Sequence, residues 1–212
     1  MSRETKRGLR LMVYDRTCRG SGMLPGLSHA WGAGGAMFRM LRRFDAYRGV
    51  ETWEEGLRFL AEHEPDRPIA QVQFWGHGKW GSAKVAGCPL GRRALQSRHE
   101  LYAPLRDIAA RMQKGEDGLW WWRTCETFGA DAGQAFATEL SQFLDCRVAG
   151  HTYIIGHVQS GLHSLLPGQT PQWAADEGIR EGTPQQPVSA YWSKIWRPKT
   201  ITFLRDTVPE GY

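Results

Sequence analysis

No stretch of the 212-residue chain approaches the ~18 consecutive apolar residues that a membrane span requires. The first residues are charged, and no apolar signal core with a cleavage site follows them. Cysteine is scarce as well, because Cys18, Cys88, Cys125 and Cys146 are widely separated and show no paired spacing typical of a zinc site. A chain of this length also has no need of disulfides. We therefore expect a cytoplasmic protein with free thiols and no membrane contact.

A concentrated charge of one sign is also absent. The formal net charge is +5, and the basic residues are spread over a segment near the N-terminus and one predicted helix. Dispersed charge of this kind is typical of solvated surface, so we do not expect nucleic-acid binding. Hydrophobic residues make up 41% of the chain, which is ordinary for a globular protein, and the length fits one domain. We expect a single domain over residues 1–212, with residues 1–8 flexible.

Tryptophan, by contrast, is abundant, with ten in the chain. Trp120, Trp121 and Trp122 are consecutive in a segment that we interpret as a strand. Successive side chains of a strand point to opposite faces, so both faces of this strand must accept an indole. Most of the tryptophans are expected in the core or in a pocket wall.

Short apolar runs alternate with segments of helical spacing. Predicted strands cover 9–14, 47–50, 69–75, 118–124, 146–155 and 200–204, and predicted helices cover 36–44, 52–63, 101–112 and 131–144. Thr52 is the expected N-cap of the second helix. A glycine-rich loop is expected over 20–35, a small hairpin over 81–90 and a long loop over 164–190. Strands alternating with helices predict an α/β fold with a mostly parallel sheet.

Two of the predicted strands end in residues that could react. The strand 69–75 ends at His77 between two glycines, and the strand 118–124 ends at Cys125. In open α/β sheets, sites form outside the carboxyl ends of the strands, so the two side chains are expected at one edge. A thiolate attacks a carbonyl and an imidazole manages the proton, while the amides of Gly78 and Cys125 could hold the developing oxyanion. A buried cysteine and a turn histidine are the structural alternative.

The stretch 74–78, Phe-Trp-Gly-His-Gly, and the stretch 122–129, Trp-Arg-Thr-Cys-Glu-Thr-Phe-Gly, resemble two motifs of the caspase-like cysteine peptidases. That superfamily includes caspases, gingipains, separase and the bacterial CHAT domains. The sequence Cys-Glu-Thr at 125–127, with Gly129 and the helix after it, is closest to the CHAT-type pattern. The order of elements resembles that fold from Leu9 to about Gly156.

The resemblance implies a caspase-like three-layer sandwich and peptide-bond cleavage. Cys125 would be the nucleophile and His77 the general acid/base, with no metal or cofactor. The implied partners are a protein or peptide substrate and, where the chain needs one, an activating or regulatory protein. In the family, loops at the strand ends build a substrate pocket beside the cysteine, which makes Trp31 a candidate pocket residue.

Further candidates for the substrate pocket remain open. Trp173 and Trp192 flank the long late loop, and each could wall a pocket or pin the loop down. Glu126, Asp131 and Asp176 are acids near the presumed site. If one of them lines the pocket, a basic residue would be preferred before the scissile bond. We expect the loop 164–190 to be mobile and to border a groove beside Cys125.

Other functions are weighed against the peptidase. His151, His157 and His163 recur every six residues and could bind a metal on one strand face, although glycines interrupt that strand and satisfied or exposed histidines fit better. The glycine-rich loop lacks the Lys-Ser/Thr ending of a phosphate-binding loop. The main rival is a catalytically silent caspase-like domain that binds a protein. Another thiol-dependent hydrolase or acyltransferase is a third reading.

Overall fold

A computed structural model describes residues 7–20 and 26–212. Residues 1–6 of the N-terminal segment predicted to be flexible, and residues 21–25 of the predicted glycine-rich loop, lie outside the described residues. The described helices are α1 (Leu27–Met40), α2 (Trp53–Glu62), α3 (Tyr102–Arg111), α4 (Ala130–Leu144) and the short 3-10 helix η1 (Arg92–Leu95). The strands are β1 (Leu9–Asp15), β2 (Ala46–Val50), β3 (Ile69–Trp75), β4 (His77–Lys79), β5 (Ser82–Val85), β6 (Cys88–Gly91), β7 (Gly115–Arg123), β8 (Cys146–His151), β9 (Val158–Gln159), β10 (Leu162–Leu165), β11 (Ile179–Gly182), β12 (Pro187–Ala190) and β13 (Ile201–Thr202).

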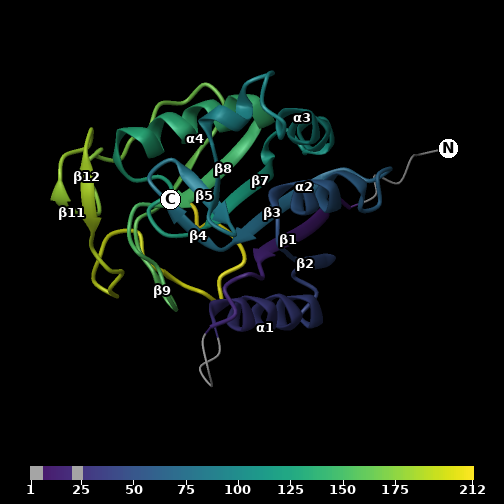
Figure 1. Ribbon diagram of the computed structural model, residues 1–212, viewed down its shortest axis with the longest axis horizontal. Coiled ribbons are helices and arrows are strands. Elements are labelled where there is room, and N and C mark those ends of the chain that lie inside the picture. Colours follow the sequence, from purple (N-terminus) through teal and green to yellow (C-terminus); the bar gives the residue numbers. More distant parts are fainter. Residues whose placement is uncertain (1–6, 21–25) are drawn as a thin grey trace.

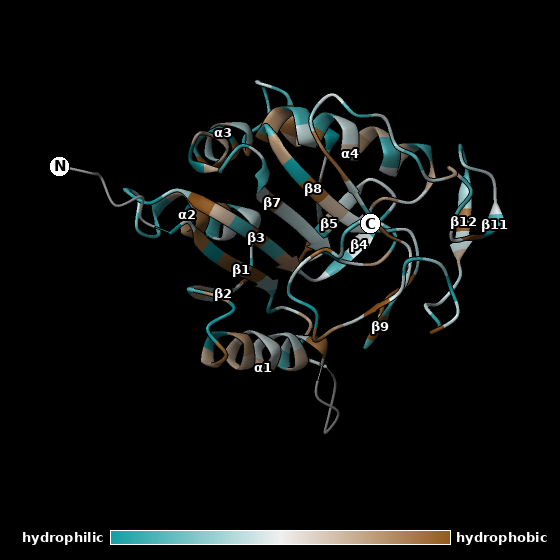
Figure 2. Cartoon of the chain, turned by 180° about the vertical axis from the view of Figure 1, so that it is seen from behind, coloured by the Kyte–Doolittle hydropathy of each residue, from teal (hydrophilic) through white to brown (hydrophobic). Residues whose placement is uncertain are grey.

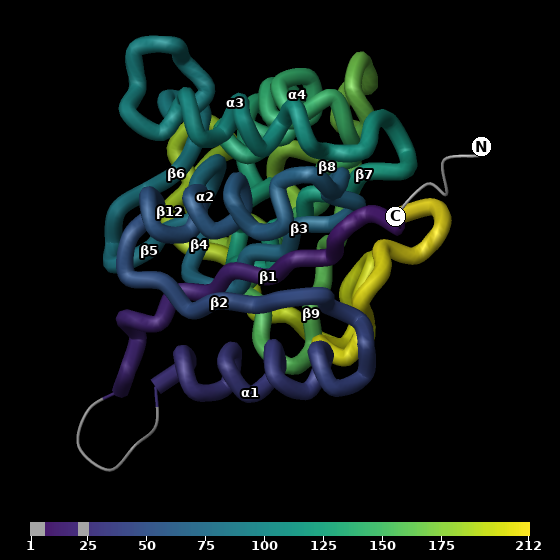
Figure 3. Tube along the Cα trace, turned by 90° about the vertical axis from the view of Figure 1, so that its right-hand side faces the viewer, coloured from purple at the N-terminus to yellow at the C-terminus, as the bar shows by residue number. Residues whose placement is uncertain are grey.

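A six-stranded sheet in the order β10-β8-β7-β3-β1-β2 forms the centre of the molecule. All neighbouring strands in it are parallel except β10, which pairs antiparallel with β8. The α/β class and the mostly parallel sheet are thus confirmed. Helices α2, α3 and α4 cover one face, whereas α1 lies on the other (Figures 1 and 3). The C-terminal segment from Ile201 shares that second face, because Ile201, Val208 and Tyr212 pack with Trp121.

The period of two in the strands fixes which side chains reach which face. Leu9, Leu11 and Val13 of β1 join the large core under α2, α3 and α4, while Met12 packs with Phe38 of α1 on the other face. The three consecutive tryptophans follow the same rule. Trp120 and Trp122 lie in the large core, Trp121 lies on the opposite face, and all three are fully buried, as the sequence predicts. In Figure 2, β7 is pale between browner strands, because tryptophan is not strongly hydrophobic on the scale used there.

Helix α2 begins where the sequence places it. The Thr52 side chain accepts a hydrogen bond from the Glu55 amide at 3.2 Å, which satisfies one of the free amides of the first turn. The strand predictions at 9–14, 47–50, 69–75 and 118–124 and the helices at 101–112 and 131–144 agree with the structure to within a few residues at each end. The predicted hairpin near 81–90 is confirmed as the sheet β4-β5-β6.

Helix α1 differs from its prediction. The sequence indicates a loop to residue 35 and a helix over 36–44, but the helix runs from Leu27 to Met40. Gly34 and Gly35 stand inside it because a Cβ there would lie 2.6 Å from Trp75 and 2.7 Å from Tyr47, respectively. The glycines thus allow close packing of the helix on the sheet rather than a loop. Met40 and Leu41, predicted to face inward, are exposed, and Phe38 is buried instead.

The last third of the chain is less regular than predicted. The strand predicted over 146–155 ends at His151, and the strand predicted over 200–204 is only β13, which pairs with β9 outside the central sheet. The predicted long loop 164–190 holds the two-stranded sheet of β11 and β12. Among the described residues, no helix is long and apolar enough to cross a membrane.

Candidate functional site

The pairing of β3 with β7 brings His77 and Cys125 to one edge of the sheet. The two strands are parallel, and their last paired residues are Trp75 and Arg123. His77 and Cys125 each stand two residues beyond that pair. Since neighbouring strands lie about 4.8 Å apart, the two backbones leave the sheet side by side and at the same level. The placement at the carboxyl ends of adjacent strands agrees with the prediction.

His77 opens the hairpin formed by β4 and β5. The hairpin closes with the pair Lys79 and Ser82, so Gly78 stands one pair further along, opposite Ala83. In a two-residue hairpin the closing pair exchanges hydrogen bonds and the next pair does not. The Gly78 amide therefore points away from β5 and is not used by the ladder.

Gly78 also packs tightly against the loop that carries Cys125. A Cβ at this position would lie 2.7 Å from the Cβ of Thr124 and would overlap the hydroxyl of Thr127. The hydroxyls of Thr124 and Thr127 are hydrogen-bonded to each other, and the Gly81 amide donates to the Thr127 carbonyl at 3.0 Å. The sequence suggested that this glycine leaves room for a substrate backbone. The structure instead uses it to bring the histidine hairpin against the cysteine loop.

The residue after Cys125 has an unusual backbone. Glu126 has φ of 56°, in the left-handed region that side-chain-bearing residues seldom adopt. The turn is held by two amides, since the Glu126 N–H donates to the Tyr153 carbonyl at 3.1 Å and that of Phe128 donates to His151 at 3.0 Å. Strained backbone of this kind is often found at functional sites. Here it turns the chain sharply between β7 and α4, with Cys125 at the apex.

A cavity of about 550 Å³ contains both candidate catalytic side chains. Its volume is within the range of small-molecule and substrate sites. Eight apolar side chains from five separate segments line it, namely Leu27, Ala30, Trp31, Trp75, Ile154, Ile155, Trp192 and Phe203. The Trp31 ring meets the exposed His77 imidazole edge-on, with 5.5 Å between ring centroids. Trp31 therefore lies beside the histidine and lines the same cavity as Cys125.

Cys125 is partly buried at this cavity, and its sulfur contacts the backbone of Ile155. The Ile155 amide donates to Sγ at 3.4 Å, and the Ile155 carbonyl lies 3.8 Å from Sγ. Burial raises the pKa of the Cys125 thiol above its usual value, and the nearby Glu126 carboxylate raises it further against the opposing effect of the Ile155 amide. The resting side chain is thus a neutral thiol, so it needs a base to become a nucleophile.

Arg123 lies just below the two reactive residues and is almost fully buried. Its guanidinium lies between the rings of Trp75 and Trp121, at 4.8 and 4.6 Å from their centroids. It donates to Gln159 Oε1 at 2.8 and 3.2 Å and to the carbonyls of Phe203 and Arg205 at 2.9 and 2.7 Å. Burial lowers the pKa of Arg123 to about 9, which leaves it charged at neutral pH. The sequence offered no sign of this role, because the partners are distant in the chain.

Three of the predicted substrate-binding residues lie outside the cavity. Glu126 is buried, burial raises the pKa of its carboxyl, and its Oε2 has no hydrogen-bond partner. Asp131, in the first turn of α4, accepts a hydrogen bond from Gln185 Nε2 at 2.6 Å. Trp173 is buried, and its Nε1 donates to the Phe128 carbonyl at 3.0 Å. Its indole also stacks on the Phe128 ring. Trp173 thus pins the late segment down, whereas Trp192 lines the cavity.

The loop 164–190 does not border this cavity. None of the described residues that line it comes from that segment, which is fastened to α4 through Asp131, Gln134 and Trp173. The prediction of a groove built by this loop is therefore wrong. The wall comes instead from residues 154–157, whose backbone continues from β8, and from Trp192, whose bridge to Ile154 brings it alongside.

The three regularly spaced histidines have separate environments. His151 is fully buried, and its Nδ1 lies 3.1 Å from the Ser160 carbonyl. His163 Nε2 lies 2.7 Å from Glu177 Oε1, and its ring stacks on Trp173. His157 is exposed and lines the Cys125 cavity. The described residues contain no group of three or more His, Cys, Asp or Glu side chains arranged to hold a metal ion.

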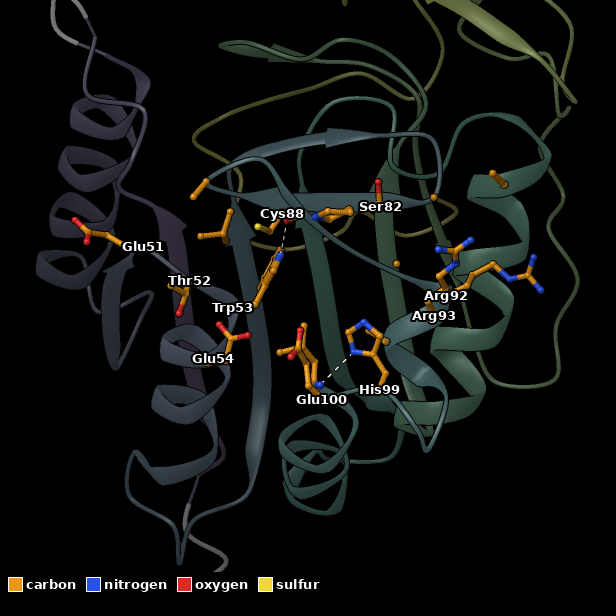
Figure 4. Close-up of a pocket in the computed structure, with 18 residues that line it drawn as sticks. Glu51, Thr52, Trp53, Glu54, Ser82, Cys88, Arg92, Arg93, His99 and Glu100 are labelled. Carbon is orange, nitrogen blue, oxygen red and sulfur yellow. Dashed lines mark hydrogen bonds between the residues drawn. The ribbon is translucent and has the colours of Figure 1, made fainter.

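A second cavity, of about 650 Å³, lies between the start of α2, η1 and the β5–β6 hairpin (Figure 4). It too is lined by a cysteine and a histidine, Cys88 and His99. Figure 4 shows them at opposite ends of the cavity. His99 Nδ1 accepts the Leu101 amide at 3.2 Å, and Trp53 Nε1 donates to the Cys88 carbonyl at 2.9 Å. This pair is therefore not a second dyad, although the cavity is the larger one.

A scan against protein-family models, a search of curated proteins and a search of solved structures each found no match to the chain.

Proposed function

We propose that this chain is a cysteine endopeptidase of the caspase-like type, with Cys125 as nucleophile and His77 as general acid/base. The observation that carries the proposal is the register of β3 and β7, which puts both residues two positions past the pair Trp75–Arg123 and into one cavity. The order of elements along the chain also supports it, because the histidine follows β3 and the cysteine follows β7, which are neighbours in the central sheet.

The reaction would proceed in two stages. Cys125 Sγ attacks the carbonyl carbon of a peptide bond while His77 takes the thiol proton. The amides of Gly78 and Cys125 donate to the oxyanion, and the free orientation of the Gly78 amide supports its part in this. His77 then gives the proton to the leaving amine as the C–N bond breaks, which leaves a thioester on Cys125. His77 next takes a proton from a water molecule, whose oxygen attacks the thioester carbonyl. The C–S bond then breaks, and His77 returns the proton to the sulfur.

Among the described hydrogen bonds, those of Cys125 Sγ go to Ile155 and none goes to His77. The two side chains must therefore approach one another when substrate binds, as catalytic pairs often do. A protein or peptide is the proposed substrate, and an activating protein could supply the closure. We also propose a cytoplasmic location, because all four cysteines are free thiols.

The test is cleavage of a mixed peptide library by purified variants. Cys125→Ala should abolish cleavage, while Cys88→Ala, which removes an exposed thiol elsewhere, should not. His77→Ala should lose about 100-fold or more in kcat/KM, the scale of general acid–base catalysis. His29→Ala, an exposed histidine on α1, is the matched control and should retain full activity. Full cleavage by Cys125→Ala would end the proposal.

His157→Ala decides which histidine acts as the base, because His157 lines the same cavity. We expect less than a tenfold loss, since His77 alone shares the register of Cys125. A loss as large as that of His77→Ala, with His77→Ala nearly active, would reassign the base.

The second candidate function is a catalytically silent domain that binds a protein. It is favoured by the raised pKa of the Cys125 thiol and by the hydrogen bonds of Sγ, which among the described residues go to Ile155 and not to His77. Alkylation at neutral pH separates the two. In a working dyad, Cys125 reacts faster in the wild type than in His77→Ala, because the imidazole promotes thiolate formation. Equal rates, together with no peptide cleavage, would favour the binding domain.

A further inference from the structure

The side chains that line the cavity with Cys125 and His77 indicate which substrates it can accept. Apolar side chains dominate, and no described residue lining it is Asp, Glu or Lys. Leu27 and Trp192 at its rim are 50% and 64% exposed. Large apolar side chains left in water around a concave site mark a place where another apolar group binds.

An acidic side chain finds no free permanent positive charge among the described residues that line this cavity. Arg123 is the one permanent charge among the described lining residues, but its donors are directed to Gln159 and to the carbonyls of Phe203 and Arg205. Its guanidinium also lies over the rings of Trp75 and Trp121. A carboxylate entering the cavity would lose its water without gaining the paired hydrogen bonds that an open guanidinium offers.

A basic side chain is disfavoured even more strongly. The acids that could have neutralised it lie elsewhere: Asp131 is bound to Gln185, Asp176 is exposed outside the cavity, and Glu126 is buried behind the cysteine loop. Arg123, still charged, would repel an incoming ammonium or guanidinium across a medium of low polarity. Neither a negatively nor a positively charged substrate side chain is therefore stabilised in this cavity, which leaves apolar side chains as those that fit it.

We propose that this cavity selects peptides with a bulky apolar side chain, of the leucine, methionine or phenylalanine class, at the residue whose carbonyl is attacked. The inference rests on the proposed peptidase function and adds its substrate class. The side chain inserts between Trp31 on α1 and the wall formed by Ile154 and Trp192. The specificity is therefore set by α1 and the irregular late segments rather than by the strands that hold the dyad.

The experiment uses five blocked peptides of Gly, Ala and Ser that differ only at the residue before the scissile bond, which is Phe, Leu, Ala, Lys or Asp. We expect kcat/KM for the Phe and Leu peptides to be roughly tenfold higher than for the Ala peptide. It should be roughly 100-fold higher than for the Lys and Asp peptides. Trp192→Ala should reduce the preference for Phe over Ala several-fold. Trp196→Ala is the matched control, since Trp196 is 73% exposed and lies outside this cavity, and it should leave the preference unchanged.

Binding to Cys125→Ala, measured by calorimetry with the same peptides, separates this inference from the proposed function. If the wild type cleaves nothing but Cys125→Ala binds the Phe and Leu peptides at least tenfold more tightly than the others, the peptidase proposal fails and the apolar pocket stands. Affinities that are equal or undetectable for all five peptides overturn the inference. Tightest binding or fastest cleavage of the Lys or Asp peptide overturns it as well.

Discussion

The chain up to His151 and the chain after it are built in different ways. In the first region, the strands of the central sheet are five to nine residues long, alternate with helices and pair in parallel, and the separate β4-β5-β6 sheet has strands of three to four residues. In the second, the strands are two to four residues long, and only β10 joins the central sheet. The first region holds His77 and Cys125, and the second supplies Ile154, Trp192 and Phe203 to the cavity around them.

In the proposed peptidase, the difference would separate the chemistry from the choice of substrate. A backbone ladder fixes the positions of His77 and Cys125, because the register of β3 and β7 determines where both strands end. Side chains fasten the C-terminal segment of the second region to the sheet. Gln71 and Gln73 of β3 donate to the Asp206 carbonyl at 2.9 and 3.3 Å, and Arg123 of β7 holds Phe203 and Arg205. A region fastened in this way can change its walls without moving the dyad.

Arg123→Met should break this connection and give the largest effect on stability. It removes a buried cation together with its hydrogen bonds to Gln159 and to the carbonyls of Phe203 and Arg205. We expect a loss of about 3 kcal/mol or more in the free energy of unfolding. Denaturant titration measures the total, and hydrogen exchange should show the loss first at residues 201–206, with α3 and α4 still protected.

Arg180→Met is the control for Arg123→Met. Arg180 is exposed on β11, 3.7 Å from Glu181, and a surface pair of this kind contributes about 0–1 kcal/mol. If Arg123→Met cost no more than this control, the side-chain fastening of the second region would be wrong. Uniform loss of exchange protection across α3, α4 and residues 201–206 would show instead that the two regions unfold as one unit.

The sequence predicts the first region well because its signals are local. Period-two and helical spacing mark the elements, and Thr52 marks the start of α2. The positions of His77 and Cys125 follow from two strand ends. The α1 prediction was wrong because Gly34 and Gly35 serve packing against Trp75 and Tyr47, which no local pattern reveals.

The walls of the cavity could not be predicted for a related reason. Arg123 is joined to carbonyls 80 and 82 positions away, and Ile154 meets Trp192 through a single bridge. Composition made 164–190 look like a site loop, whereas Trp173 stacks on Phe128 and holds it against the core. Trp173 and Trp192 are both tryptophans beside the predicted long loop, and only their tertiary contacts distinguish their positions.

The boundary between the two regions should be sensitive to acid through His151. Burial lowers the pKa of His151 to about 3 from its usual 6.5. The unfolded chain therefore takes up a proton below about pH 6.5 that the folded chain refuses until about pH 3, so stability falls as the pH falls through this window. His151→Asn keeps a donor for the Ser160 carbonyl but does not titrate. Between pH 7 and pH 4.5 the free energy of unfolding should fall in both proteins. The fall should be smaller in His151→Asn than in the wild type, by at least ~1 kcal/mol.

His29→Asn, on the exposed surface of α1, controls for the loss of a histidine as such. It should unfold with the same pH dependence as the wild type. If His151→Asn also matched the wild type, the acid sensitivity would have to come from other groups. Glu177 is the first of these, because its hydrogen bond from His163 lowers the pKa of its carboxyl despite partial burial.

The smallest expected effect concerns the cysteine loop itself, where Glu126 adjoins Cys125 and its carboxylate contributes to the raised pKa of the thiol. Glu126→Gln keeps the size of the side chain and removes its charge, so the Cys125 pKa should fall. The pH at which alkylation of Cys125 reaches half its maximal rate should move down, and the rate at neutral pH should rise about two- to threefold. Mass spectrometry of the Cys125 peptide measures this directly, without interference from the exposed Cys88. Glu139→Gln, on the outer side of α4 and paired with Arg92, should leave the curve unchanged. A curve that does not move in Glu126→Gln would mean that the Glu126 charge has no part in the thiol's pKa, which burial and the Ile155 amide would then set.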